Sequence, residues 1–510
     1  MLLPRRISAF LTQKVVNVYR PYQPLVQDVW SVGVGAGMNS QFKRERLRLH
    51  LRRLFILTAA LLCVLAVFTV YTRSDRLHFT LSPSPSPSPG SSRSNISKDQ
   101  FVSAILREPV EGLLDPGPIR KKCNETKFQE GLVWHCAAVN GGIGNVVNMW
   151  LNCVRYAMEA GATTMILPRL SARSDNLIDL GDENRSVELS YLLDLPYFFE
   201  SWKQVCPQIR AVASDAEVPN LAPIAASPHL SPSGVKSFNM RKYLIVDPTG
   251  WREAFDAWMA KNEVFTTMSA EKPVRVWQNL VLAQWNREAH PLEFAHSFPR
   301  LFRHIPETRR LAALVLWNLE KKLASPVVSD AIVLSPGISP SSKVNSLGPH
   351  RLVANGFLGA HMRVAADAAA AGWPGYEAQA PFYIAEAKRL NLTTIFLATG
   401  SPEHRDRFRA DAANEGLDVV TKEDLLDEEE LAELQNLTWD QQALVDYDVL
   451  MYSTSFYGFV RSSFSWSLAL RRGTLPEAGT SRTTKEDEYR DNLSAVSGRY
   501  GSINPEGLWP

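Results

Sequence analysis

The chain is poor in three features that would each define a simple class of protein. Only five of its 510 residues are cysteines, which excludes a small disulfide scaffold. Its net charge is +2, from 55 Lys and Arg against 53 Asp and Glu, so it lacks the basic excess typical of nucleic-acid-binding proteins. With 28 Gly, 32 Pro and 45% hydrophobic residues it is neither collagen-like nor globally disordered. The composition predicts a globular body of about two or three domains with no nucleic-acid partner.

The sequence contains a single long hydrophobic run. Residues 54–72 read LFILTAALLCVLAVFTVYT without a charge, and as a helix they would span about 28 Å, the thickness of a bilayer core. Residues 1–53 carry ten Lys/Arg and two Asp/Glu, and the positive-inside bias leaves such a tail in the cytosol. We therefore predict a cytosolic basic tail (1–53), a transmembrane helix (54–72) and a mildly acidic luminal body.

A stem and glycosylation sites are predicted beyond this span. The alternating Ser-Pro tract at residues 81–94 cannot pack into a core, and we assign residues 73–115 to a Ser/Pro-rich stem. Asn-x-Ser/Thr triplets, which accept N-glycans in secreted proteins, all follow the tract. They start at Asn95, Asn124, Asn184, Asn391, Asn436 and Asn492.

Four cysteines belong to the predicted luminal body. Cys63 lies in the span, which leaves Cys123, Cys136, Cys153 and Cys206. An oxidising compartment favours two disulfides, for which three pairings are possible. We favour Cys123–Cys136 and Cys153–Cys206, and the spacing lacks the close ligand pairs of a zinc site.

Strand and helix patterns alternate through two halves, residues 116–330 and 331–510. The first half opens with a strand (131–139), a glycine-rich turn (140–145), a helix (146–160) ended by Gly161 and a strand (163–170). The second predicts strands at 352–364, 393–400, 417–420 and 456–460 and helices at 379–390, 402–416, 439–451 and 463–472. This alternation predicts an α/β fold with mostly parallel sheets, in which ligands bind at the carboxyl ends of the strands.

The first candidate site is the turn NGGIGN. Gly141, Gly142 and Gly144 allow the backbone to approach a ligand, and the following helix N-terminus favours an anionic group. A purely structural tight turn is the alternative. The spacing is not the G-x-G-x-x-G of dinucleotide sites, which argues against NAD.

The second candidate site is GAHMR at residues 359–363. Alternation along a strand places His361 and Arg363 on one face at its carboxyl end. Arginine has the planar donors that suit a diphosphate, and histidine can bond a phosphate, ribose or base edge. A structural ion pair at the end of the sheet is the alternative.

The third candidate site is RSSFSW at residues 461–466. Ser462 or Ser463 suits the N-cap of the last predicted helix, and capping alone is the alternative reading. Hydroxyls and free N–H groups at a helix N-terminus also form an anion site. Together with Arg363 it would bracket a diphosphate.

Asp446 and Asp448 have the Asp-x-Asp form of metal-dependent sugar-nucleotide transferases. They fall inside a predicted helix, where residues two apart diverge by about 200° and cannot readily chelate one ion. We therefore predict no metal site, and Asp446 is expected to be structural.

In combination these motifs resemble the GDP-fucose protein O-fucosyltransferase-like family, in its fungal and plant-like branch. The resemblance spans roughly residues 130–475 and rests on NGGIGN, GAHMRVAAD, FLATG and ALVDYDVLMYSTSFYGFVRSSFSWSLALRR. It implies a GT-B glycosyltransferase of two Rossmann-like domains, with the acceptor on the side of 116–330 and the GDP-sugar on that of 331–510. It also implies metal-independent, inverting transfer of fucose from GDP-fucose, with no cofactor.

The resemblance also assigns residues. Arg363 would hold the diphosphate and act with Asn145 as a catalytic residue, with Asn145 near the sugar and acceptor. The donor-binding set would comprise Gly141, Gly142, Gly144, His361, Arg363, Asp367, Ser462, Ser463, Phe464 and Ser465.

The sequence departs from the family at two positions. Members often carry an acidic residue where this chain has Ala365, and an Asp where it has Gly400. Two alternatives therefore stay open: a transferase that uses another nucleotide sugar, and a catalytically silent binding or scaffold protein with the same fold. The expected partners are a nucleotide-sugar donor, a protein or glycan acceptor and the membrane, and the tail, span and stem favour the Golgi or ER membrane.

Overall fold

A computed structural model describes residues 93, 96–173, 177, 185–231, 235, 240–241, 244–278, 284–334, 351–485, 488–498 and 505–510. The predicted cytosolic tail, the predicted transmembrane helix at 54–72 and the Ser-Pro tract, apart from residue 93, lie outside these residues. Among the helices of the described residues, none combines the length and the apolar character needed to cross a bilayer. The described ranges beyond residue 88 form one compact unit.

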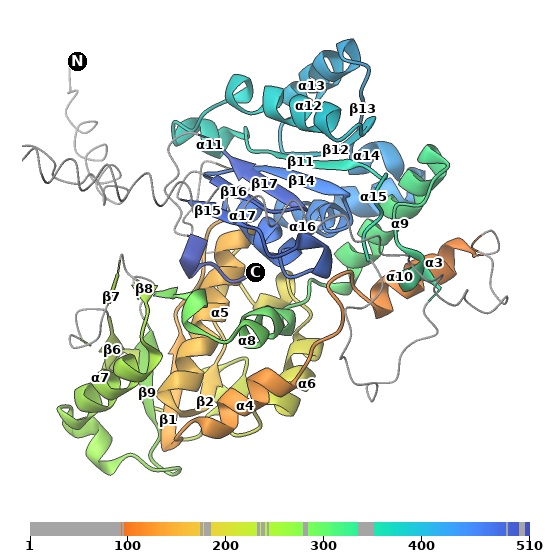
Figure 1. Ribbon diagram of the computed structural model, residues 1–510. Helices are drawn as coiled ribbons and strands as arrows, with labels where there is room; N and C mark the ends of the chain where they lie inside the picture. Colours follow the sequence, from red (N-terminus) through yellow and green to blue (C-terminus); the bar gives the residue numbers. More distant parts are fainter. Residues whose placement is uncertain are drawn as a thin grey trace, which may run out of the picture. The chain divides into compact units, whose positions relative to one another are not determined.

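The first half of the chain is built on a parallel sheet. Its strand order is β5-β2-β1-β9-β6, and every pairing in it is parallel (Figure 1). The strands are β1 (Gln129–Cys136), β2 (Ala162–Ile166), β5 (Arg210–Val212), β6 (His229–Leu230) and β9 (Val274–Gln278). Smaller sheets pair β3 (Leu170–Ser171) with β4 (Ser186–Val187), and β8 (Leu244–Ile245) with both β7 (Met240–Arg241) and β10 (Gln284–Trp285).

The helices of this half pack around its sheet and the loops that follow it. The most central is α5 (Ile143–Ala160), which ends at Gly161 in the left-handed conformation, φ 70°, as the sequence predicted. The others are α4 (Gly117–Glu125), α6 (Leu195–Val205), α7 (Pro248–Ala260) and α8 (Leu292–Ser297).

The second half contains a seven-stranded sheet in the order β13-β12-β11-β14-β17-β16-β15. The pairings from β13 to β17 are parallel, and β16 and β15 extend the sheet antiparallel. The strands are β11 (Leu358–Met362), β12 (Thr394–Thr399), β13 (Asp418–Val420), β14 (Ser455–Phe459), β15 (Thr483–Lys485), β16 (Glu488–Arg490) and β17 (Ser494–Ser497). The predicted mixed α/β fold with mostly parallel sheets is therefore confirmed.

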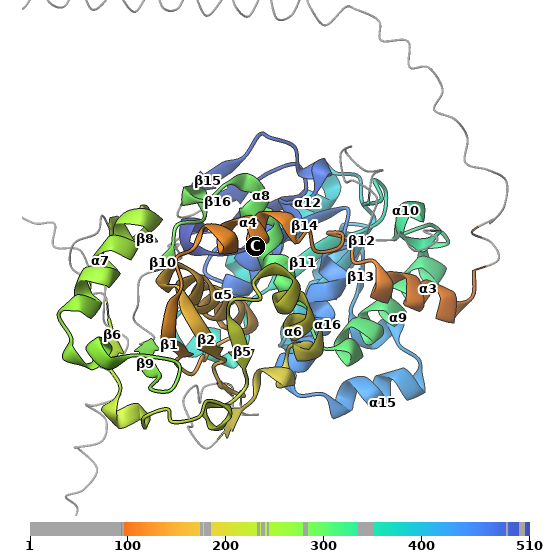
Figure 2. The ribbon, with the colours of Figure 1, turned by 90° about the horizontal axis from the view of Figure 1, so that it is seen from below.

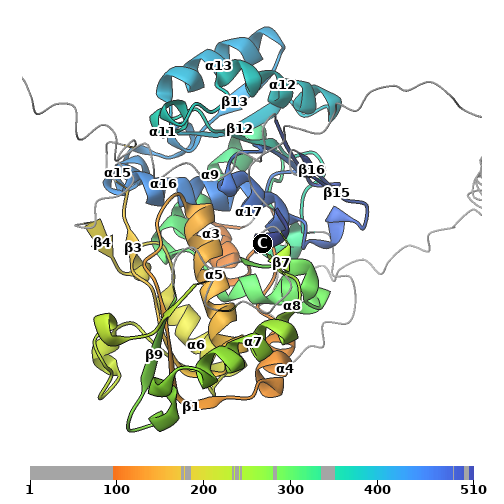
Figure 3. The same cartoon turned by 90° about the vertical axis from the view of Figure 1, so that its left-hand side faces the viewer.

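Helices cover both faces of this second sheet (Figures 1 and 3). On one face Leu358, Ala360 and Met362 of β11 join the core under α12 and α13. On the other face Phe357 joins a core that includes α9, α16 and α17. The helices are α9 (Pro306–Leu323), α11 (Ala366–Ala370), α12 (Ala380–Arg389), α13 (Pro402–Asn414), α14 (Lys422–Leu425), α15 (Glu428–Asn436), α16 (Trp439–Leu450) and α17 (Ser463–Arg472).

The boundary between the halves is crossed in both directions. Helix α3 (Lys98–Arg107) lies in the segment assigned to the stem, yet it packs on α9 and on α10 (Asp330–Val333), as Figure 2 shows. α9 itself belongs to the core of the second half. At the other end of the chain, Trp509 is 1% exposed in the core of the first half. Segments that sequence order assigns to one half therefore pack into the core of the other half.

The preferred disulfide pairing is wrong. The structure joins Cys123 to Cys206 and Cys136 to Cys153, with Cα–Cα separations of 5.5 and 5.9 Å. Cys136 is the last residue of β1 and Cys153 lies on the helix that packs over that strand. Cys123 and Cys206 lie near the ends of two neighbouring helices, α4 and α6. Proximity in the fold, not order along the chain, decides the pairing.

Candidate active site

The three predicted motifs meet where α5, β11 and α17 come together. Gly144 in the first turn of α5 lies against the backbone of Ser463 and Phe464, and its added Cβ would be 2.7 Å from the Phe464 nitrogen. The Phe464 ring in turn lies 4.3 Å from the ring of His361, centroid to centroid. Residues more than 300 positions apart therefore form one site at the carboxyl end of strand β11, and Figure 3 shows α5 beside α17.

His361 is a buried, neutral histidine. It is 8% exposed, and its Nδ1 lies 2.8 Å from the Ser465 hydroxyl. Burial, reinforced by the positive charge of Arg363, lowers the pKa of His361 to about 3. At neutral pH the ring is therefore uncharged and can bond a ligand without adding a cation to the site.

The serines at the start of α17 differ in role. Ser462 occupies the N-cap position, as predicted, but its side chain makes no capping hydrogen bond, so the first turn keeps N–H groups that no side chain caps. Ser463 and Phe464 are half-buried. Ser465 is fully buried, and its hydroxyl accepts the Phe459 N–H at 3.1 Å while it bonds His361. The structure thus places Ser465 behind the site, where it orients the imidazole.

The glycines of the first motif also separate into different roles. Gly144 is buried and allows α5 and α17 to touch, whereas a Cβ on Gly142, the N-cap of α5, would meet nothing within 4 Å. Gly141 has φ +95°, a conformation that favours glycine, and lies beside the Asn145 amide. Asn145 is exposed on the first turn of α5. Among the described residues no hydrogen bond joins Asn145 to His361 or Arg363.

Arg363 is held by a carboxylate that it shares with a second arginine. Asp367, one turn further along the chain, forms ion pairs with both Arg363 and Arg173. Burial alone would raise the pKa of Asp367, but hydrogen bonds and charge from Arg363 and Arg173 lower it. Arg173 comes from the first half of the chain, so this ion-pair network ties the two halves together beside the predicted diphosphate site.

Two indole rings surround these guanidinium groups. The Arg363 guanidinium carbon is 5.8 Å from the centre of the Trp373 ring and 5.9 Å from that of Trp439. Arg173 lies over Trp439 at 5.2 Å, and Arg461 over Trp373 at 5.4 Å. Stacked arginines of this kind keep a fixed orientation and present their remaining N–H donors to a ligand.

Asp440 adds a carboxyl to the same neighbourhood. Its Oδ2 accepts the Arg173 backbone N–H at 3.0 Å, and its buried Oδ1 has no hydrogen-bond partner in the described structure. Burial raises the pKa of Asp440 to about 6.

Both departures from the family pattern have a physical explanation. Ala365 is buried at the N-cap of α11, and Asp367 two residues later supplies the carboxylate that pairs with Arg363. A Cβ on Gly400 would lie 3.0 Å from Trp439 Nε1, so a larger residue would press on the indole beside Arg173 and Arg363. The Trp439 indole therefore leaves little room for any side chain at residue 400.

The two carboxylates of the Asp-x-Asp sequence diverge, as their spacing on a helix predicts. Asp446 and Asp448 lie on α16 and point to different partners, the Lys422 ammonium at 2.8 Å and the His304 imidazole at 2.8 Å. Among the described residues no group of three or more His, Cys, Asp or Glu side chains is arranged to hold a metal ion.

Several site residues were missed by sequence reasoning. Arg461 is the first residue of the third motif, yet it was not included in the predicted donor-binding set. Arg173, Trp373, Trp439 and Asp440 lie in loops or helix starts whose local pattern carries no signal, because only the tertiary fold brings them to Arg363.

Comparison with known proteins identifies the family. The family model described as GDP-fucose protein O-fucosyltransferase matches residues 133–475, which contain all three motifs. The chain belongs to this family and is therefore a glycosyltransferase. No curated protein matches the sequence.

Solved structures with a similar fold include three fucosyltransferases. POFUT1 in complex with GDP-fucose is 12% identical, with a TM-score of 0.40 over 73% of this chain and 99% of that chain. A mutant of Arabidopsis thaliana FUT1 in complex with GDP is 10% identical, with a TM-score of 0.30 over 76% and 79%. NodZ from Bradyrhizobium is 15% identical, with a TM-score of 0.33 over 67% and 92%.

Proposed function

We propose that this protein transfers fucose from GDP-fucose to a hydroxyl of a protein or glycan, with inversion and without a metal ion. The family to which the chain belongs supports the donor. The observation that carries the proposal is the meeting of α5, His361 and α17 next to an arginine held in a fixed orientation. A cation beside a helix N-terminus is suited to a diphosphate.

In the proposed reaction the acceptor oxygen bonds to C1 of fucose while the bond from C1 to the β-phosphate oxygen breaks. The electron pair leaves with GDP, and the acceptor proton passes through water to the departing phosphate. Arg363 and the first N–H groups of α17 stabilise the charge that develops on the phosphate. Asp367 and the two indoles keep the guanidinium in place, and neutral His361 provides a hydrogen bond. Asn145 is assigned to the sugar and acceptor side.

Membrane topology and location complete the proposal. The uncharged run at 54–72 and the basic tail before it support a type II protein whose described body faces the lumen of the Golgi or ER. Two disulfides fit such an oxidising compartment.

Two alternatives make different predictions for the same site. A transferase for another nucleotide sugar would bind that donor more tightly than GDP-fucose. A silent scaffold protein would bind GDP or its sugar without turning it over. Gly400 motivates both alternatives, because the Trp439 indole leaves little room for a side chain at a position where the family pattern has an Asp.

The test is calorimetric titration of the full-length protein in detergent with GDP and GDP-fucose, with and without EDTA, followed by an assay of GDP release. We expect both ligands to bind in the presence of EDTA. Arg363→Ala should weaken GDP binding at least about 30-fold, because charge-assisted hydrogen bonds from a guanidinium to a phosphate contribute about 2 kcal/mol or more. Arg363→Lys keeps the charge and should recover only part of that loss. A folded protein that binds no GDP would refute the transferase proposal, and binding lost in EDTA would refute the metal-free mechanism.

A panel of GDP-mannose and UDP-sugars separates the alternatives in the same assay. Preference for one of these donors over GDP-fucose would favour the first alternative. Tight binding of GDP-fucose without GDP release, in the presence of acceptor-bearing cell extract, would favour the second.

A further inference from the structure

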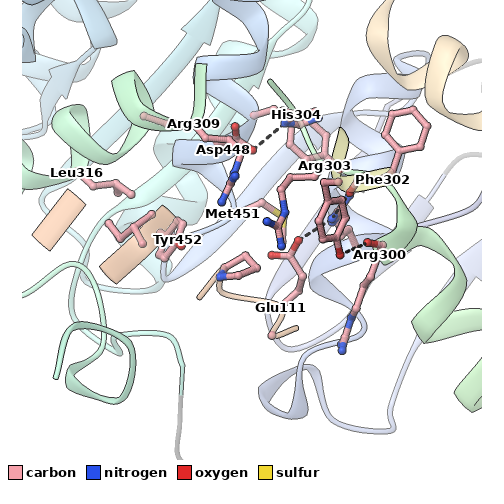
Figure 4. A pocket seen from close by; sticks show the side chains of 17 residues that line it. Glu111, Arg300, Phe302, Arg303, His304, Arg309, Leu316, Asp448, Met451 and Tyr452 are labelled. Carbon is pink, nitrogen blue, oxygen red and sulfur yellow. Dashed lines mark hydrogen bonds and ion pairs between the residues drawn. The ribbon is translucent and has the colours of Figure 1, made fainter. Parts of the chain in front are cut away.

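A polar hollow lies at the opposite end of α17 from the candidate active site. Its walls come from the segment after α3, from the turn at Arg300–His304, from α9 and from the ends of α16 and α17 (Figure 4). Arg471, which lines it, follows Ser463 by eight residues on α17, which corresponds to about 12 Å along the helix. The hollow is therefore separate from the predicted donor site.

Positive charge exceeds negative charge in this hollow. Four guanidinium groups line it, from Arg300, Arg303, Arg309 and Arg471, against the two carboxylates of Glu111 and Asp448. Arg471 is matched by Glu111, 2.6 Å away. Burial alone would raise the pKa of Glu111, but the charge of Arg471 lowers it to about 2, so this pair is ionised and neutral overall.

The other three arginines have no carboxylate within ion-pair distance in the described part of the chain. Arg309 donates to the Leu106 carbonyl at 2.6 Å, and Arg300 donates to the Leu113 carbonyl at 3.1 Å. The buried Nε of Arg300 has no hydrogen-bond partner among the described residues. Buried donors of this kind require an acceptor.

Arg303 packs against an aromatic ring. Its guanidinium carbon lies 3.7 Å from the centre of the Tyr197 ring, and no hydrogen bond from this guanidinium is found among the described residues. Burial lowers the pKa of Arg303, which reflects a charge partly removed from water without a full counter-charge. In Figure 4 the side chains of Arg303, Glu111 and Asp448 converge on the same space.

One wall of the hollow is apolar. Ile105, Ala312, Leu316 and Met451 line it. A ligand that combines an anionic group with a carbon framework would complement both the arginines and the apolar wall of the hollow.

We propose that this hollow binds the oxyanion group, phosphate or sulfate, of a small molecule, with Arg303 as the principal donor. The planar guanidinium of Arg303 is held by Tyr197 with its N–H edges free for an oxyanion. Arg300 and Arg309 supply further positive charge. Asp448, whose buried Oδ2 has no hydrogen-bond partner in the described structure, opposes the anion and limits its affinity.

A series of ring contacts links this hollow to the candidate active site. His304 contacts Tyr447 at 5.1 Å, Tyr447 contacts Phe464 at 5.2 Å, and Phe464 contacts His361 at 4.3 Å, measured between ring centroids. Binding in the hollow is nevertheless independent of the donor proposal, because no residue of the hollow belongs to the predicted donor set.

The test is calorimetric titration of the full-length protein, saturated with GDP to fill the diphosphate site, with inorganic phosphate, sulfate, glucose 6-phosphate and a 6-sulfated N-acetylglucosamine at constant ionic strength. We expect at least one of these anions to bind with one site per chain. Tighter binding of the sugar-borne anions would identify an organic ester as the ligand class, and equal affinities would identify the free ion.

Variants locate the site. Arg303→Gln should weaken anion binding about 10-fold or more, because one charge-assisted contact is lost. Asp448→Asn should tighten anion binding about 3-fold, because a repelling charge is removed. Arg407→Gln on α13, half-exposed and distant from the hollow, and Arg363→Ala should leave it unchanged. No binding of any of the four anions, binding lost in Arg363→Ala, or unchanged affinity in both Arg303→Gln and Asp448→Asn would overturn the proposal.

Discussion

Gly144 on α5 lies in direct contact with the backbone of Ser463 on α17. The contact joins the first and last motifs of the sequence, and it also joins the helices that begin on either side of the candidate active site. It leaves no room for a side chain at residue 144, so the approach of the two helices requires this glycine.

Gly144→Ala is therefore expected to destabilise the protein by about 2–3 kcal/mol, because the added methyl overlaps backbone atoms that cannot move independently. GDP affinity should fall at the same time, since α17 would be displaced. Chemical denaturation and GDP titration measure the two effects. The matched control is Gly142→Ala, whose methyl meets open space and should cost less than about 1 kcal/mol. Equal effects of the two substitutions would contradict the helix contact.

Gly400 and Trp439 should be coupled. Gly400→Ala places a methyl 3.0 Å from the indole, which we expect to cost about 1 kcal/mol and to weaken GDP binding through Arg363. In the background of Trp439→Ala the same methyl has no ring to meet, so its cost should disappear. A double-mutant cycle on the free energy of unfolding measures this coupling. A cost that persists without the tryptophan would show that the explanation for Gly400 is incorrect.

Asp367 should control the orientation of Arg363. Asp367→Asn removes the charge that holds both Arg363 and Arg173, and we expect the dissociation constant for GDP to rise about 10-fold. Asp406→Asn, at an exposed carboxylate that pairs with Arg405, is the control and should leave GDP binding unchanged. Unchanged GDP affinity in Asp367→Asn would mean that Arg363 does not depend on this ion pair.

Disulfide connectivity can be measured directly. Mass spectrometry of non-reduced proteolytic fragments should find Cys123 linked to Cys206 and Cys136 linked to Cys153. In the loop-closure model the first bond closes the longer loop, with a sequence separation of 83 against 17, so Cys123→Ala/Cys206→Ala should lower stability by about 1 kcal/mol more than Cys136→Ala/Cys153→Ala. A fragment linking Cys123 to Cys136 would contradict the structure.

Acid stability should depend on His290. Its Nε2 accepts from Arg155 Nε at 2.9 Å and its Nδ1 donates to the Asn286 carbonyl at 3.0 Å, an arrangement that needs a neutral ring. Burial and then the charge of Arg155 lower the pKa of His290 to about 3. The unfolded chain therefore binds a proton below about pH 6.5 that the folded chain does not, and stability falls as the pH falls through that region.

The measurement is the pH dependence of the unfolding free energy for wild type and His290→Gln. At pH 5 the wild type should have lost about 2 kcal/mol through this residue, which the variant does not lose. Asp440 and Asp446, whose pKa values burial raises to about 6, act in the opposite direction below pH 6, and both proteins share this effect. Parallel pH profiles for the two proteins would contradict the assignment of a neutral His290.

Much of the local structure could be predicted from the sequence. The helix ended by Gly161, the strand that carries His361, the helix that begins at Ser463 and the divergence of Asp446 from Asp448 all follow from periodicities and capping residues that act over a few positions. Three of the candidate site's elements were therefore correctly placed on the chain, and their motifs were sufficient to indicate the family.

The tertiary structure alone decided what these elements touch. It paired Cys123 with Cys206 and brought Arg173 to Asp367 across 194 positions. It also placed Trp509 in the core of the first half and α9 in the core of the second. It also showed that Gly144 serves a helix contact and that Gly400 makes room for Trp439. Such contacts depend on the volume and charge of side chains at positions distant in sequence. They therefore produce no periodic signal in any local stretch of the sequence. The sequence by itself thus determined the elements and the chemistry of their ends, and packing determined the partners of each residue.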